Sequence, residues 1–120
     1  MVLQATVVSY NDVFEAVNCL KFGKNDGYTG LSTNYVKYGF DELFVHISLF
    51  FSSMLVYCVV SADFLVSSII PIPKGKNSTG VDSNNYRAIA LSSIFGKIFD
   101  RIILNRYSNI LITSERQFGF

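Results

Sequence analysis

The longest uncharged stretch of the chain is the feature that most limits how it can fold. The twenty residues from Leu43 to Ala62 contain no Lys, Arg, Asp or Glu, and they lie between Glu42 and Asp63. About twenty apolar residues are enough for a helix to cross a bilayer. The stretch also contains four serines and one histidine, and its flanks lack the Lys/Arg asymmetry that orients membrane helices. A helix buried in a globular core is therefore the favoured interpretation. The alternative is a small membrane-associated or interaction protein with a hydrophobic helix at 43–62.

The spacing of apolar residues in this stretch is helical. From Asp41 onward they recur at intervals of three and four residues, as on one face of an α-helix. The predicted stripe consists of Leu43, Phe44, Ile47, Phe50, Phe51, Met54, Leu55 and Cys58. Ser48, Ser52 and Ser53 fall off this stripe. His46 has no second His or carboxylate at ligand spacing, so we expect a packed or surface residue and not a metal ligand.

Composition restricts the chain to one ordinary globular domain. With 120 residues, the chain is too short for a multidomain enzyme. With 50% hydrophobic and 16% charged residues, it is too apolar for a disordered tail. Cys19 and Cys58 cannot supply a disulfide framework or a complete structural zinc site, so reduced thiols are expected. The first residues lack the basic and apolar regions of a secretory signal. We therefore expect an intracellular protein of the cytoplasm or nucleus.

Periodicity and turn residues divide the rest of the chain into helices and one hairpin. Helical spacing predicts the helices, and two β-branched runs separated by a polar loop predict antiparallel strands. The expected helical segments are Asn11–Leu20, Ser32–Gly39, the helix from Asp41 and Ile94–Leu111, and the expected strands are Leu65–Pro73 and Tyr86–Leu91. Asn11 or Asp12 is the expected N-cap of the first helix, and Ser92 or Ser93 that of the last. The expected fold class is α+β, with helices packed on a β-hairpin.

Charge is distributed unevenly along the chain, although the net formal charge is only +1. Residues 1–73 contain three Lys/Arg and six Asp/Glu, which gives −3. Residues 74–106 contain two Asp/Glu and six Lys/Arg, which gives +4; the six are Lys74, Lys76, Arg87, Lys97, Arg101 and Arg106. A cationic hairpin and helix beside a mildly acidic body are compatible with phosphate binding, and an ordinary solvated helix face is the alternative.

No complete catalytic or metal-binding motif is present. Gly75-Lys76 lacks the upstream glycine and the following Ser or Thr of a phosphate-binding loop. The acidic residues are scattered or directly adjacent, and no nucleophile stands with a histidine base. We therefore expect no catalytic residue and no metal ligand in this chain.

Several sequence blocks occur in an order typical of one family. The blocks are Ile70–Lys76, Asn85–Ser92, Gly96–Arg106 and Gln117–Phe120, preceded by glycine-containing segments at Leu20–Lys24, Gly30-Leu31 and Tyr35–Gly39. Over roughly residues 10 to 120, they resemble the first conserved blocks of reverse transcriptases encoded by non-LTR (LINE-type) retrotransposons. The joint order of the blocks is more specific than any one of them.

The resemblance implies a partial fingers subdomain of a right-hand polymerase fold. Residues 1–10 would be an N-terminal tail and residues 11–120 a partial reverse transcriptase domain without the palm. In such fingers, Arg87 is the expected nucleotide contact and Lys74 the second, because a guanidinium binds phosphate oxygens bidentately. Lys76, Lys97 and Lys24 are the expected contacts to the nucleic-acid backbone.

The same resemblance implies the partners of the complete enzyme. These are an RNA template, a DNA primer and a deoxynucleoside triphosphate, and the metal of the complete enzyme is Mg²⁺. We expect this chain itself to hold no cofactor. Weak nucleic-acid binding by the chain itself is expected, and membrane binding is not. A further alternative is a fragment that docks on a full-length polymerase through exposed apolar helix faces.

The sequence departs from the family pattern at several positions. Thr29 stands where the lead-in loop usually has aspartate, Ala88 where many members have proline, and Ser61 where a proline often precedes the first strand. The chain stops at Phe120, before the metal-binding aspartates of the palm, and contains no Asp-Asp pair. Because the two-metal mechanism needs those ligands, we expect no polymerase activity from this chain alone.

Overall fold

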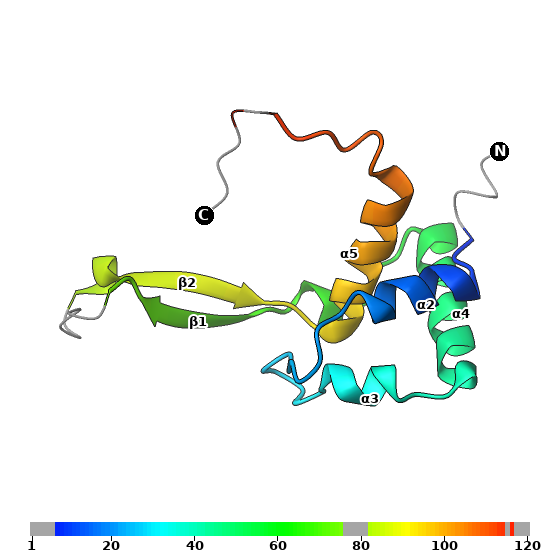
Figure 1. Cartoon of the computed structure of the whole chain (residues 1–120), viewed down its shortest axis with the longest axis horizontal. Coiled ribbons are helices and arrows are strands. Elements are labelled where there is room, and N and C mark those ends of the chain that lie inside the picture. The colour runs from blue at the N-terminus through cyan, green and yellow to red at the C-terminus, as the bar shows by residue number, and fades with distance from the viewer. Residues whose placement is uncertain (1–6, 76–81, 115, 117–120) are drawn as a thin grey trace.

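The computed structural model describes residues 7–75, 82–114 and 116. The elements are α2 (Tyr10–Asn18), α3 (Thr33–Lys37), α4 (Asp41–Tyr57), η1 (Ala62–Leu65), β1 (Ser68–Pro73), η2 (Ser83–Asn85), β2 (Tyr86–Leu91) and α5 (Ile94–Tyr107), where η denotes a 3₁₀ turn. Figure 1 shows the helices grouped together and the hairpin extending away from them, in a molecule of 53 × 35 × 25 Å. The mixed α+β class is confirmed.

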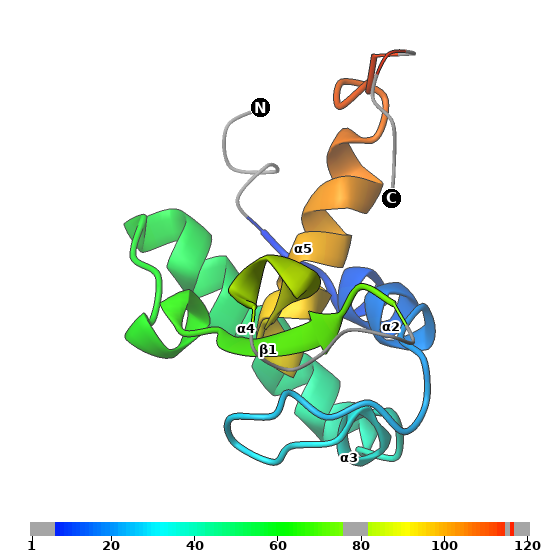
Figure 2. The ribbon, with the colours of Figure 1, turned by 90° about the vertical axis from the view of Figure 1, so that its left-hand side faces the viewer.

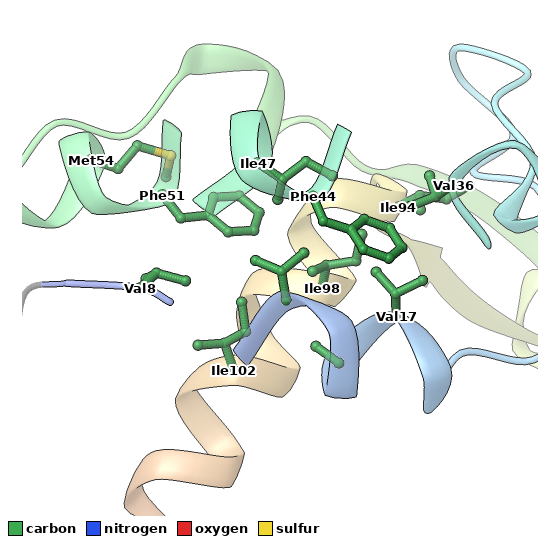
Figure 3. Close-up of a cluster of buried hydrophobic side chains, with 12 residues drawn as sticks. Val8, Val17, Val36, Phe44, Ile47, Phe51, Met54, Ile94, Ile98 and Ile102 are labelled. Carbon is green, nitrogen blue, oxygen red and sulfur yellow. The ribbon is translucent and has the colours of Figure 1, made fainter. Parts of the chain in front are cut away.

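The core is formed by helices, and α2 lies at its centre. Helix α2 packs on both α4 and α5 and buries Val13, Ala16 and Val17 there. Figure 3 shows the buried side chains of α4 and α5 meeting those of α2 between the three helices. The full set of buried apolar residues is Val8, Val13, Ala16, Val17, Val36, Phe44, Ile47, Phe51, Met54, Ile94, Ile98 and Ile102. Removal of these side chains from water is the main force that holds the helices together.

Helix α2 begins at Tyr10 because Ser9 caps it. The Ser9 Oγ accepts a hydrogen bond from the Asp12 backbone N–H at 3.2 Å, and the Asp12 carboxylate accepts one from the Ser9 N–H at 2.9 Å. This reciprocal pair is a capping box. The prediction of Asn11 or Asp12 as N-cap is therefore wrong, because Asp12 occupies the third helical position and reaches back to the true cap.

Helix α4 is shorter and less buried than its sequence predicts. It ends at Tyr57, because Cys58 adopts a left-handed backbone conformation with φ of 53°. Phe50 is 45% exposed and Cys58 is exposed, so the prediction that both lie on the buried stripe is wrong. Ser48 was expected off the stripe but is buried, and its hydroxyl donates to the Val45 carbonyl at 2.7 Å. No helix in the described part of the chain is long and apolar enough to span a membrane.

Serine caps set the starts of the two other helices as predicted. The Ser93 Oγ accepts a hydrogen bond from the Gly96 N–H at 3.0 Å and caps α5, and Ser32 caps α3. Helix α5 buries one isoleucine per turn: Ile94, Ile98 and Ile102. It ends at Tyr107, four residues before the predicted end at Leu111, and Leu111 is exposed. The predicted helix was too long because its last apolar residues, Ile110 and Leu111, are exposed and gain no burial from a further helical turn.

The hairpin is antiparallel as predicted, but the helices do not pack on it. Its register runs from Ser68 opposite Leu91 at the base to Pro73 opposite Tyr86 at the far end. All strand residues between the base and the far end are exposed, and the hairpin projects toward the viewer in front of the helices in Figure 2. The expectation of helices packed on a hairpin is therefore wrong. Helices α2, α4 and α5 bury their apolar faces on one another, which leaves no buried face for the strands.

The core predicts which residues of α4 are needed for folding. Phe51 is fully buried, with its ring centroid 5.1 Å from that of Phe99 and 6.1 Å from that of Phe64. Phe51→Ala is expected to lower the free energy of unfolding by about 3–5 kcal/mol, because it opens a cavity. Leu49→Ala, on the same helix but at a residue 61% exposed, is expected to change it by less than about 0.5 kcal/mol. Urea unfolding checks both, and equal losses would contradict the assigned core.

Candidate functional site

Lys74 and Arg87, the two cations expected to bind nucleotide, lie at the same end of the hairpin. Arg87 is paired with Ile72, and the ladder continues past Pro73 through a hydrogen bond from the Lys74 N–H to the Asn85 carbonyl at 2.8 Å. Lys74 directly follows Pro73, the last residue of β1, and Arg87 is the second residue of β2, next to the Pro73–Tyr86 pair. The two cations are therefore close neighbours along the ladder at this end of the hairpin.

Arg87 is free to bind a ligand, and Lys74 has hydrogen-bond donors left to bind the same ligand. Arg87 is exposed and makes no hydrogen bond or ion pair with any residue that the structure describes. The Lys74 ammonium has three donors, one of which reaches the Asn84 carbonyl at 2.7 Å. Asp82 lies at the same end and accepts a hydrogen bond from the Asn84 N–H at 3.0 Å. Two cations and one carboxylate therefore leave this end of the hairpin positive.

The other basic residues expected to contact nucleic acid lie apart from this pair. Lys97 is half-buried on α5, which starts at the base of the hairpin, and Lys24 is exposed in the loop between α2 and α3 (Figure 1). Lys76 lies outside the described residues. The structure thus brings Lys74 and Arg87 together and places Lys97 and Lys24 in the helical part of the molecule.

A buried carboxylate orders the glycine-rich loop, a role that neither periodicity nor motif spacing predicted. Asp26 is only 2% exposed, and it accepts hydrogen bonds from the Thr29 N–H at 3.0 Å, the Gly30 N–H at 3.1 Å and the Thr29 hydroxyl. Burial acts to raise the pKa of Asp26, but the hydrogen bonds together outweigh it and lower that pKa. Thr29, at the position where the family usually has aspartate, is therefore the partner of a carboxylate three residues upstream.

The same loop lies beside the base of the hairpin at Gly27. Its φ of +75° lies in the left-handed region that favours glycine, and a Cβ there would stand 3.5 Å from Leu91 and 3.9 Å from Ser68. A largely apolar cavity of about 500 Å³ lies beside this contact, lined by Asp26, Tyr28, Thr29, Leu31, Leu43, His46, Ile47, Phe50, Ser61, Asp63, Phe64, Val66, Leu91, Ser93 and Phe95. The glycine-rich loop, helix α4 and the base of the hairpin therefore meet at this cavity.

Arg106 belongs to the basic part of the sequence but has a structural role. Its guanidinium forms an ion pair with the Asp12 carboxylate at 2.8 Å and donates to the Val7 carbonyl. Burial acts to raise the pKa of Asp12, but hydrogen bonds from Ser9 and the Arg106 guanidinium together lower it. The charge count along the sequence could not separate this cation from the exposed Arg87.

Comparison with known proteins supports the resemblance found in the sequence. No family model matches the chain. The RNA-directed DNA polymerase from the mobile element jockey of Drosophila funebris is 34% identical over 129 residues, which covers 100% of this chain and 13% of that polymerase. A 115 kDa protein in the type-1 retrotransposable element R1DM of Drosophila melanogaster is 27% identical over 113 residues, covering 91% of this chain and 11% of that protein.

These similarities confirm the resemblance to non-LTR retrotransposon proteins, one of which is an RNA-directed DNA polymerase. The chain spans little more than a tenth of the length of each of these relatives.

The lowered pKa values of Asp12 and Asp26 predict loss of stability in acid. A carboxyl whose pKa is lower in the folded state binds fewer protons there than in the unfolded state, so it stabilises the fold at neutral pH. That contribution is lost as pH falls below about 4. Asp26→Asn is expected to lower stability at pH 7 and to reduce the further loss between pH 7 and pH 3, as measured by urea unfolding.

Asp100→Asn is the matched control, because Asp100 is exposed and makes no hydrogen bond or ion pair within the described ranges. Its pH dependence is expected to follow that of the unmodified chain. If Asp26→Asn shows the same pH dependence as this control, the Asp26 carboxylate does not hold the loop as described.

Proposed function

We propose that the chain is part of the RNA-directed DNA polymerase of a non-LTR retrotransposon, and that residues 11–120 contribute to the fingers region of that enzyme. Two observations support the proposal. The chain matches one segment of such a polymerase along its whole length. Its hairpin projects from a packed helical body, as an element would that reaches over a substrate (Figure 1).

The observation that carries the proposed role is the pair of cations at the far end of the hairpin. Arg87 is exposed without a partner among the described residues, and Lys74 lies just past the end of β1 at the same end of the hairpin. A guanidinium donates to two phosphate oxygens at once, and an ammonium adds a second positive charge. We assign the two residues to the triphosphate of an incoming deoxynucleoside triphosphate, where they would offset charge during phosphoryl transfer.

The remaining basic residues are assigned to the nucleic acid of the complete enzyme. Lys24, Lys76 and Lys97 would contact backbone phosphates of the RNA template or the DNA primer. Contacts of this type position a nucleic acid without reading its sequence, and their strength falls as salt rises. The complete enzyme, with this chain as part of it, would act inside the cell.

The metal chemistry is assigned to other parts of the complete enzyme. Among the residues described here, no group of three or more His, Cys, Asp or Glu could hold a metal ion. Mg²⁺ in the complete polymerase would neutralise charge on the reacting phosphates. We therefore propose that this segment contributes substrate contacts and not the metal ligands of catalysis.

Substitution of Arg87 tests the proposed nucleotide contact. Arg87→Ala is expected to weaken binding of a fluorescent deoxynucleoside triphosphate by about tenfold, because it removes charge-assisted hydrogen bonds to phosphate. Lys74→Ala is expected to weaken it less, since the Lys74 ammonium is already bonded to the Asn84 carbonyl. Fluorescence anisotropy with the 120-residue chain and Mg²⁺ measures both.

Arg101→Ala supplies the control for loss of one positive charge. Arg101 is exposed on α5 and makes no hydrogen bond or ion pair with the described residues. Its removal is expected to leave nucleotide affinity nearly unchanged. Equal affinities of the Arg87→Ala and Arg101→Ala variants would show that the hairpin end is not the nucleotide site.

A further inference from the structure

A second candidate binding surface lies on α3 and the segment before it. Every aromatic residue between positions 21 and 40 is more than half exposed: Phe22 59%, Tyr28 66%, Tyr35 69%, Tyr38 75% and Phe40 83%. In contrast, Phe44 and Phe51 of the neighbouring α4 are buried. We call the group formed by Phe22, Tyr35 and Tyr38 with Lys21, Lys24 and Lys37 the aromatic–lysine surface. Contiguous exposed apolar patches on a folded chain mark interaction sites.

Two of the rings and one cation are in direct contact. The Phe22 and Tyr38 centroids are 6.0 Å apart, with ring planes at 44°. The Lys37 Nζ lies 4.1 Å from the Phe22 centroid, a cation–π distance. Tyr35 precedes Tyr38 by three residues, so both project from the same side of the α3 turn. The Phe22 and Tyr38 rings and the Lys37 ammonium therefore lie side by side.

The segment that carries Phe22 is fastened to the start of α3. The Thr33 hydroxyl donates to the Lys21 carbonyl at 2.8 Å and accepts from the Lys24 N–H at 3.2 Å. The Gly23 N–H donates to the Asn34 side-chain oxygen at 2.9 Å. Because Thr33 is itself buried, these bonds hold the surface in one arrangement before any ligand arrives.

The charge of this segment favours an anionic ligand. Residues 21–40 contain three lysines and one acid, Asp26, whose buried carboxylate is hydrogen bonded within its own loop. Of the two acids that follow, Asp41 accepts a hydrogen bond from the Tyr10 hydroxyl at 2.7 Å, and Glu42 is exposed. The local net charge of +2 contrasts with the −3 of residues 1–73 as a whole.

We propose that the aromatic–lysine surface binds single-stranded nucleic acid, with bases stacked on Tyr35 and Tyr38 and phosphates near Lys21 and Lys24. Exposed aromatic faces interspersed with lysines are the combination that single strands require, because only unpaired bases can offer a free face for stacking. This inference rests on the proposed function, which already assigns Lys24 to backbone phosphates, and it adds the bases of a single strand as contacts. The surface lies on α3 and the segment before it, whereas the nucleotide contacts are assigned to the hairpin.

Tyrosine fluorescence gives a direct readout of stacking. The chain has seven tyrosines and no tryptophan, so its intrinsic emission comes from tyrosine. Addition of an oligothymidylate of about 15 nucleotides is expected to quench this emission. In the Tyr38→Ala variant we expect an affinity about tenfold weaker and less quenching, with affinity restored in Tyr38→Phe, which keeps the ring.

Tyr57→Ala is the matched control, because Tyr57 is also 75% exposed but lies at the end of α4. It is expected to bind oligothymidylate as the unmodified chain does. Lys24→Ala is expected to lower the slope of log affinity against log salt by about 0.7, whereas Tyr38→Ala leaves that slope unchanged. Arg87→Ala is expected to lose nucleotide affinity and keep oligothymidylate affinity, so the two proposals can fail separately.

Three outcomes would overturn the inference. They are equal affinity of Tyr38→Ala and the unmodified chain, equal losses in the Tyr38→Ala and Tyr57→Ala variants, and binding of duplex DNA as tight as binding of the single strand. Circular dichroism of each variant confirms that helices are retained. Tyr38 is exposed, so its truncation is not expected to disturb the core.

Discussion

Burial of helix α2 between α4 and α5 is the interaction on which the rest of the structure depends. Val13, Ala16 and Val17 are almost completely removed from water, and α2 packs on both of the longer helices. The segment before α2 is fixed by the same arrangement. The Ser52 side chain of α4 binds the Val8 backbone, and Arg106 of α5 binds Asp12. Any change that separates these helices would release the chain on both sides of α2.

The position of the hairpin follows from that core. Ile94 is fully buried in the first turn of α5, three residues after β2 ends, and Gly27 of the loop lies beside Leu91 and Ser68. The base of the hairpin is therefore held, while its far end stands away from the helices with both faces in water (Figures 1 and 2). A two-stranded ribbon alone has little stability in water. A phosphate bound by Lys74 and Arg87 would bridge its two strands and stabilise it.

Sequence periodicity predicted the elements well, because each apolar stripe is a local property. The strand Tyr86–Leu91 and the isoleucines of α5 were found this way. The first strand was predicted to begin at Leu65 but begins at Ser68, because Leu65 belongs to a 3₁₀ turn. Two other kinds of contact could not be found from periodicity. The Asp26 hydrogen bonds are local but occur in a loop without a periodic pattern, and the Arg106 ion pair joins residues far apart in the sequence. Packing of the helices on the hairpin was wrongly predicted, since apolar strand residues do not reveal whether another element covers them.

The most direct test of the central claim is a two-dimensional ¹⁵N NMR titration of the chain with a deoxynucleoside triphosphate and Mg²⁺. If the end of the hairpin is the nucleotide site, the largest chemical-shift changes will fall on the backbone amides of Lys74, Asn85 and Arg87, and the amides of α2 will change little. Largest changes within α2 or α4, or no changes at saturating nucleotide, would contradict the account.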